Sequence, residues 1–231
     1  MPIKMKIDFV SDVACPWCAV GLGALEEAIA RVGDEVEVEI LFQPFELNPD
    51  MPPGGQDLDE HLTEKYGSTP EQRVQIRDTI RRRGEEVGFT FSPEGRGRIY
   101  NTLDSHRLLH WAKYNGRPGA QYALKKALLE AYQGRAENIE SAEVLLAAVA
   151  KVGLPVGQAR AILQSKEYET EVRALEEFYR GAGIHAVPAV IINDRHLISG
   201  GQPTDVFERA LREIAAATLK RTKAPTTLAG R

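Results

Sequence analysis

The only two cysteines of the chain, Cys15 and Cys18, stand two residues apart in the sequence Cys-Pro-Trp-Cys. Two thiols at this spacing can close a small disulfide ring and reopen it by exchange. A strand-like segment over 4–10 precedes them, and an amphipathic helical pattern over 20–32 follows. A thiol at the first turn of a helix meets unpaired N–H groups and the positive end of the helix dipole, which favour the thiolate. The pattern predicts Cys15 as a nucleophile and Cys18 as the thiol that resolves a mixed disulfide.

A zinc site is the main chemical alternative, because half of such a site has the same cysteine spacing. A structural zinc ion needs four ligands, and the chain has no second cysteine pair. Its five histidines are scattered, and only His106 and His110 share a helical face. We therefore expect no metal, which leaves an inert pair of buried cysteines as the alternative to redox chemistry.

The composition is typical of a globular enzyme. The 231 residues are 43% hydrophobic, which is enough for a substantial core. The formal charge is 29 minus 33, or −4, without a basic block, so nucleic acid is not expected as a partner. The N-terminal segment does not resemble a secretory signal and no apolar stretch has the length of a membrane span, so we expect a cytoplasmic protein without membrane association. In a reducing compartment, two cysteines at this spacing are more often catalytic or redox-sensing than structural.

Hydrophobic patterning predicts three kinds of segment. Alternation over 3–9 and 36–42, on either side of the 20–32 helix, predicts a right-handed parallel β-α-β unit. Residues 57–180 are almost wholly helical in pattern, with a loop at 88–97. Asp57 is expected to cap a short helix, and Thr69-Pro70-Glu71-Gln72 has the capping sequence that begins a helix over 70–87. Further helices are expected over 102–114, 120–132, 142–152, 156–163 and 168–181. A hairpin over 189–192 and 196–199 and a helix over 203–217 then complete a β-β-α unit.

These segments divide the chain into four parts. Residues 1–50 and 182–217 form the two portions of one core, 51–181 form a helical insertion, and 218–231 form a mobile polar tail. The fold class is therefore α/β.

Four stretches of sequence give this order of elements a family resemblance. They are Ser-Asp-Val-Ala-Cys-Pro-Trp-Cys at 11–18, Asn-Thr-Leu-Asp-Ser-His-Arg-Leu at 101–108, Ala-Val-Pro-Ala at 186–189 and Ser-Gly-Gly-Gln-Pro at 199–203. Together they resemble the thioredoxin-like fold as elaborated in the DsbA-like family, with its large α-helical insertion. The resemblance is strongest to the cytosolic FrnE-like branch, which is related to 2-hydroxychromene-2-carboxylate isomerases and kappa-class glutathione transferases.

The resemblance implies that the Val187-Pro188 peptide bond is cis and faces the cysteine pair across a substrate groove. Only X-Pro bonds adopt the cis form at modest cost, and a proline without an N–H leaves neighbouring backbone free to pair with an extended substrate. Pro188 therefore joins the two cysteines as a predicted catalytic residue.

Three further residues are expected to affect the reactivity of the cysteine pair. Pro16 removes one N–H that would stabilise the thiolate and fixes the backbone where the helix begins. Trp17 offers a flat apolar surface for a peptide or aromatic substrate, or else packs against the fold. Asp12 either exchanges a proton with Cys18 through water or holds the turn before the helix.

The resemblance also suggests a groove for substrate or glutathione. Asn101, Asp104 and His106 could line the cleft where the helical insertion overhangs the pair, although helix capping and packing are equally open to them. In a glutathione-binding relative, Val187 and the start of the last helix near Gln202 would hold the tripeptide.

The leading hypothesis is a thiol–disulfide oxidoreductase acting on a disulfide in a protein or small molecule. No cofactor is expected to be tightly bound, and glutathione or another thiol would reset the pair. The direction of electron flow and a possible homodimer are left open. One alternative is a glutathione-dependent isomerase or transferase of an aromatic small molecule, but those relatives often carry serine where Cys15 stands and lack the second thiol. A second alternative is a thiol-bearing binding or chaperone module that uses the helical overhang.

Overall fold

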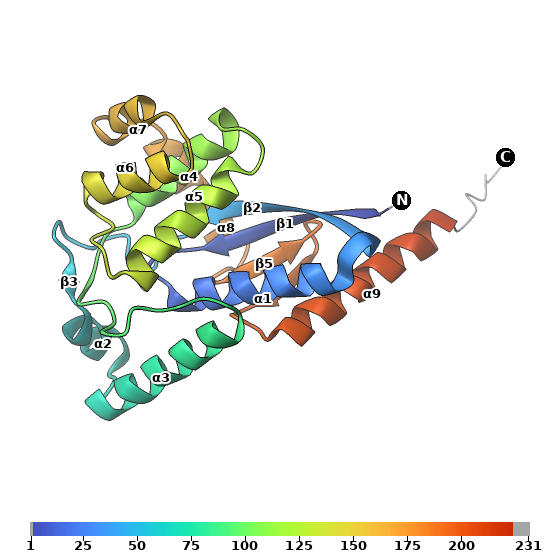
Figure 1. Cartoon of the computed structure of the whole chain (residues 1–231), viewed down its shortest axis with the longest axis horizontal. Helices are drawn as coiled ribbons and strands as arrows, with labels where there is room; N and C mark the ends of the chain where they lie inside the picture. The colour runs from blue at the N-terminus through green and yellow to red at the C-terminus, as the bar shows by residue number, and fades with distance from the viewer. Residues whose placement is uncertain (1, 224–231) are drawn as a thin grey trace.

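Strand β1 lies at the centre of a mixed four-stranded sheet in this computed structural model, which describes residues 2–223 (Figure 1). The strands of this sheet are β1 (Ile3–Ser11), β2 (Val36–Pro44), β5 (Ala189–Ile192) and β6 (His196–Ser199). Their order is β2-β1-β5-β6, with β1 and β2 parallel and the other pairs antiparallel. The predicted β-α-β and β-β-α units, and with them the thioredoxin-like fold class, are confirmed.

Helices α1 (Pro16–Val32) and α9 (Thr204–Lys223) lie side by side on one face of this sheet (Figure 1). Their apolar faces meet β1 in the main core, where Phe9, Leu25, Phe207 and Leu211 are all completely buried. A one-turn 3-10 helix over Gly33–Glu35 connects α1 to β2. This packing fixes the first turn of α1 against the end of β1.

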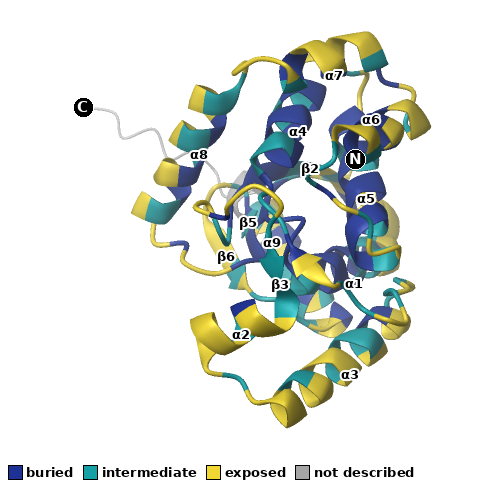
Figure 2. Cartoon of the chain, turned by 90° about the vertical axis from the view of Figure 1, so that its left-hand side faces the viewer, coloured by how far each residue is buried: buried dark blue, intermediate teal, exposed yellow. Residues whose placement is uncertain are grey.

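The segment between β2 and β5 contains most of the remaining helices. They are α2 (Leu58–Tyr66), α3 (Pro70–Glu86), α4 (Leu103–Asn115), α5 (Ala120–Leu129), α6 (Ala142–Lys151), α7 (Val156–Leu163) and α8 (Glu169–Gly181), with a π-helical turn over Glu130–Gly134. Helices α4 to α7 enclose a second apolar core around Leu108, Leu128 and Leu145. Figure 2 shows that α2 and α3, by contrast, are mostly exposed.

The capping signals are borne out. The Asp57 side chain accepts hydrogen bonds from the first turn of α2, and Thr69 and Gln72 form the reciprocal box that begins α3.

Two local features differ from the sequence expectations. Short strands β3 (Gln56–Asp57) and β4 (Arg98–Ile99) pair antiparallel in a region expected to hold only helices and a loop. Helix α9 continues to Lys223, past its expected end at 217, because neither Gly nor Pro interrupts the helical pattern there. The rest of the expected tail, 224–231, lies outside the described residues. None of the helices within 2–223 combines the length and apolar character that crossing a bilayer requires.

Candidate active site

Cys15 and Cys18 occupy the first turn of α1, where the helix begins at the end of β1. Cys15 is the N-cap residue with extended backbone, and Pro16 is the first helical residue. The Cys18 N–H donates to the Cys15 carbonyl oxygen at 3.1 Å. Cys15 is 4% exposed whereas Cys18 is completely buried. Any contact of the pair with solvent or substrate therefore belongs to Cys15.

The environment shifts the pKa values of the two thiols in opposite directions. The hydrogen bond from the Cys18 thiol, assisted by the backbone N–H groups of Cys18 and Trp17, lowers the pKa of Cys15 despite the opposing effects of burial and the Asp12 charge. Burial, and then the same hydrogen bond to Cys15, raise the pKa of Cys18 well above that of a free thiol. This arrangement favours a thiolate at Cys15 and a protonated thiol at Cys18.

The Val187–Pro188 peptide bond is cis, as the resemblance implied, and it lies against the cysteine pair. The Cys15 Sγ is 3.4 Å from the Val187 carbonyl oxygen, to which the protonated thiol donates. This contact brings the N-terminus of α1 together with a segment from the opposite end of the chain.

Two glycines permit this close approach: Gly21, which the sequence analysis did not name, and Gly201 of the 199–203 stretch. A Cβ atom on Gly21 would lie 3.0 Å from the Pro188 side chain, and one on Gly201 would lie 2.9 Å from the Trp17 carbonyl oxygen. Three segments, namely α1, the Pro188 loop and the turn before α9, therefore meet where side chains would prevent contact.

Asp12 is completely buried beside the pair. Its Oδ1 accepts the Ala14 N–H at 3.1 Å and its Oδ2 accepts the Leu47 N–H at 2.8 Å. Burial alone would raise the pKa of Asp12, but the interaction with His106 and these two N–H groups outweigh it and lower that pKa. The carboxylate thus holds the turn, as one of its two predicted roles requires. Proton exchange with Cys18 remains a prediction.

Side chains from the helical insertion also hold the loop that leads to Cys15. Gln133 Nε2 donates to the Val13 carbonyl oxygen at 2.7 Å, and Arg96 Nη1 donates to the Ala14 carbonyl oxygen at 2.6 Å. Buried carbonyls need such partners, so these contacts fix the loop geometry. No sequence pattern marks either residue, because both contacts join distant segments.

Two of the predicted groove residues lie close to the buried site: Val187, whose carbonyl oxygen contacts Cys15, and His106. The His106 Nε2 lies 3.5 Å from Asp12 Oδ1. Asn101 accepts the Leu103 N–H at the start of α4, Asp104 pairs with Arg107, and Gln202 donates to the Ser199 carbonyl oxygen. For Asn101 and Asp104, these contacts are the capping and packing roles that were open to them. Half-buried Trp17 packs against the main core.

No group of three or more His, Cys, Asp or Glu side chains within residues 2–223 is arranged to hold a metal ion. The two histidines that share a face of α4 have different neighbours. His106 approaches Asp12, while His110 contacts the rings of Tyr114 and Tyr168 in tilted arrangements.

Comparison with known proteins places this site in a family. Residues 6–212 match the model of the DSBA-like thioredoxin domain. The chain belongs to this family. One similar protein is "Uncharacterized protein YwbO" of Bacillus subtilis (strain 168), which is 32% identical over 92% of this chain and 98% of its own length. The DSBA-like fold is also shared with the probable DsbA oxidoreductase SCO1869 of Streptomyces coelicolor, with a TM-score of 0.85, 32% identity and coverage of 97% of this chain and 93% of that one.

Two solved structures with lower sequence identity share the fold alone. A 2-hydroxychromene-2-carboxylate isomerase has a TM-score of 0.68 at 15% identity, covering 93% of this chain and 98% of its own. The cytosolic disulfide reductase DsbM of Pseudomonas aeruginosa, solved with GSH, has a TM-score of 0.62 at 15% identity, covering 91% and 99%.

Proposed function

We propose that this DSBA-like protein is a thiol–disulfide oxidoreductase with Cys15 as nucleophile and Cys18 as resolving thiol. The main support for this function is the position of Cys15 at the N-cap of α1, where its Sγ lies 3.4 Å from the Val187 carbonyl oxygen. Cys18, one turn further along the helix, is completely buried. A thiolate at this position attacks one sulfur of a substrate disulfide and expels the other as a thiolate. Cys18 then attacks the Cys15 sulfur, closes the Cys15–Cys18 disulfide and releases the second half of the substrate.

An external thiol completes the cycle by reducing the Cys15–Cys18 disulfide, since the chain has no third cysteine. We assign this role to glutathione or another thiol, and we place the reaction in the cytoplasm. Support comes from the shared fold with the cytosolic disulfide reductase DsbM of Pseudomonas aeruginosa, which was solved with GSH. The substrate is a disulfide in a protein or a small molecule.

The start of α9 bears on the glutathione-dependent isomerase alternative. Thr204 Oγ1 lies 3.1 Å from Glu27 Oε2, and Asp205 adds a second carboxylate to the first turn. Arg31 pairs with both carboxylates at 2.7 Å, so these three groups keep one net negative charge, which opposes binding of a ligand carboxylate at this helix terminus. Together with the retained pair of thiols, this charge favours redox exchange.

Reduction of glutathione disulfide and of insulin, with dithiothreitol as electron donor, tests the proposal. Cys15→Ser should abolish turnover because no thiolate remains to attack. Cys18→Ser should accumulate a mixed disulfide at residue 15, detected by mass spectrometry of intact protein and peptides. Undiminished turnover in Cys15→Ser would refute the assignment. Chromene isomerisation that persists in Cys18→Ala would support the isomerase, and equal suppression of aggregation by a Cys15→Ala/Cys18→Ala variant would support a chaperone.

A further inference from the structure

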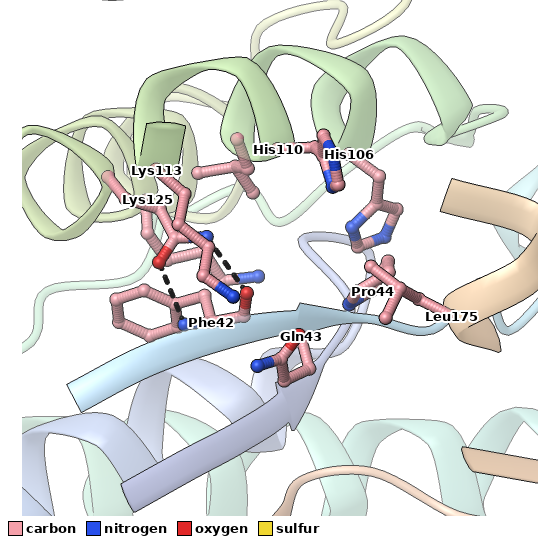
Figure 3. A pocket seen from close by; sticks show the side chains of 10 residues that line it. Phe42, Gln43, Pro44, His106, His110, Lys113, Lys125 and Leu175 are labelled. Carbon is pink, nitrogen blue, oxygen red and sulfur yellow. Dashed lines mark hydrogen bonds between the residues drawn. The ribbon is translucent and has the colours of Figure 1, made fainter. Parts of the chain in front are cut away.

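A small cavity with a basic lining lies between α4, α5 and β2. Figure 3 shows the side chains of His106, His110, Lys113 and Lys125 around this space, above Phe42. Its volume is about 10 Å³, and none of the described residues that line it carries a carboxylate. A space of this size holds one particle about as large as a water molecule, so phosphate, sulfate and carboxylate ligands are excluded.

Lys125 is buried at this cavity without a counter-ion from the protein. The residue is 0% exposed, and its Nζ has neither a hydrogen-bond partner nor an ion-pair partner among residues 2–223. Nζ lies 5.7 Å from the centre of the Phe42 ring, a contact that replaces only part of the hydration lost by a buried ammonium group. Lysine is almost never fully buried unless an opposite charge pairs with it. The surroundings of Lys125 therefore lack one negative charge.

The acceptors nearest to this cavity are engaged elsewhere. Asp12 and the two cysteines act on Lys125 through space, but none of the three lines the cavity. Both carboxylate oxygens of Asp12 accept backbone N–H groups, and Oδ1 also lies 3.5 Å from His106 Nε2. The Gln121 amide, which does line the cavity, is paired through both its oxygen and its nitrogen with the backbone of Phe42. The charge that Lys125 lacks is therefore not supplied by these groups.

Helix α4 contributes a second positive charge and the outer end of the cavity. His110 and Lys113 stand one turn apart on this helix and are only partly buried, so they place that end near solvent. The Lys113 ammonium group is positively charged at neutral pH. Burial lowers the pKa of His110, so its ring is neutral at pH 7 and offers one N–H donor. The lining thus combines two ammonium groups with an N–H donor, which is the chemistry of an anion site.

We propose that this cavity binds a single halide ion, such as chloride, with Lys125 Nζ as its buried ligand. A halide ion is monatomic and only slightly larger than a water molecule, so it meets the limit on size. Its charge supplies the counter-ion that Lys125 lacks, whereas a water would accept a hydrogen bond and leave the ammonium charge uncompensated. His110 and Lys113 close the site on the solvent side. The site is separate from disulfide exchange and does not depend on the oxidoreductase function.

Crystals of the full chain grown in sodium bromide test occupancy directly, because bromide gives an anomalous diffraction signal at its absorption edge. A peak should appear in the cavity within hydrogen-bond distance of Lys125 Nζ. Lys125→Met removes the charge while keeping most of the side-chain length, and its crystals should lack the peak. Lys126→Met, at the exposed neighbour that pairs with Glu26, is the matched control and should keep it. Wild-type crystals without a bromide peak in the cavity would overturn the proposal and leave a water site.

Urea unfolding in mixtures of sodium chloride and sodium gluconate at constant ionic strength measures binding in solution, because gluconate is too large for the cavity. Chloride that binds only the folded chain multiplies the equilibrium constant for folding by one plus the ratio of its concentration to Kd. At ten times Kd, this constant should therefore rise about 11-fold in wild type and in Lys126→Met, and should not change in Lys125→Met.

The same chloride dependence in wild type and Lys125→Met would overturn the proposal, because it would show that chloride acts elsewhere. If Lys125→Met does not fold, the wild-type protein alone decides the matter. Its folding equilibrium should then respond to chloride and to bromide but not to sulfate, which the cavity excludes. An equal response to all three anions at matched ionic strength would contradict a halide site.

Discussion

Asp12 and Glu46 are buried carboxylates with different surroundings. Asp12 accepts two backbone N–H groups and interacts with His106, which together lower its pKa. Glu46 is 2% exposed, contacts Arg173 through Oε2, and leaves Oε1 without a partner among the described residues. Burial, and then the charge of Glu176, raise the pKa of Glu46 to about 8, against the opposing effect of Arg173. Glu46 is therefore mostly protonated at neutral pH.

Glu46 makes the stability of the fold depend on pH. A glutamate in the unfolded chain has a pKa near 4.5, so between that value and about 8 the folded chain holds more protons than the unfolded chain. The free energy of unfolding should then fall as pH rises through this window, by at most about 1.4 kcal/mol per pH unit. Glu46→Gln should remove this contribution and be the more stable protein above pH 8. Urea unfolding between pH 5 and pH 9 measures the difference.

The exposed loop residue Glu94 supplies the control, because Glu94→Gln should keep the wild-type pH dependence. A Glu46→Gln variant with the same pH slope as wild type would show that Glu46 titrates normally in the fold.

Helix α1 is positioned by contact with the turn before α9 as much as by its own apolar face. A Cβ atom on Gly201 would lie 2.9 Å from the Trp17 carbonyl oxygen and 3.5 Å from the Trp17 ring. Because the nearer atom belongs to the backbone, relief requires α1 or the turn to move. Such a movement would displace the first turn of α1, where Cys15 and Cys18 lie.

Gly201→Ala should therefore lower the free energy of unfolding by about 1–3 kcal/mol, the usual range for overpacking. It should also slow disulfide exchange, because the cysteine turn shifts. Gly157→Ala in α7 is the matched control, since a Cβ atom there would meet nothing within 4 Å. Urea unfolding and the insulin assay check both variants, and equal behaviour of the two would contradict a close-packed junction.

The elements could be predicted from sequence where a long periodic pattern defines them. The β1-α1-β2 unit is of this kind. The start of α3 could also be predicted, because the capping box of Thr69 and Gln72 is a local motif. Strands β3 and β4 have two residues each, which is too short to show alternation. Lys125 lies within a helical pattern like any lysine, and only the packing of α5 against β2 buries it. The cysteine chemistry could be predicted because the Cys-Pro-Trp-Cys motif is local. The contacts of Gln133 and Arg96 with the loop before Cys15 could not, because they join distant segments.

At the scale of the whole molecule, the described residues form two apolar cores, one around the sheet and one within α4 to α7. Gln121 of α5 joins them at β2, which is an edge strand of the sheet. Its Oε1 accepts the Phe42 N–H at 3.0 Å and its Nε2 donates to the Phe42 carbonyl oxygen at 2.9 Å (Figure 3). One side chain thus replaces the hydrogen bonds of a neighbouring strand and covers part of the sheet edge.

Gln121→Leu should lower the free energy of unfolding by about 1–3 kcal/mol for each backbone group of Phe42 left buried and unpaired. It should also increase hydrogen exchange of the Phe42 amide, because α5 no longer protects it. Gln158→Leu on the exposed surface of α7 is the matched control and should change neither quantity. Native-state hydrogen exchange with mass spectrometry checks this, and unchanged protection at Phe42 would show that Gln121 does not join the two cores.

The fold as a whole leaves Cys15 4% exposed and buries Cys18 completely, and disulfide exchange depends on that difference. Alkylation of the reduced wild-type protein by iodoacetamide, resolved for each cysteine by peptide mass spectrometry across pH 4–10, measures it directly. Cys15 should react with a midpoint below that of free cysteine, about 8.5, while Cys18 should stay unmodified until urea unfolds the chain and makes the two equivalent. A midpoint for Cys15 at or above the free-cysteine value, or earlier modification of Cys18, would contradict the assignment of nucleophile and resolving thiol.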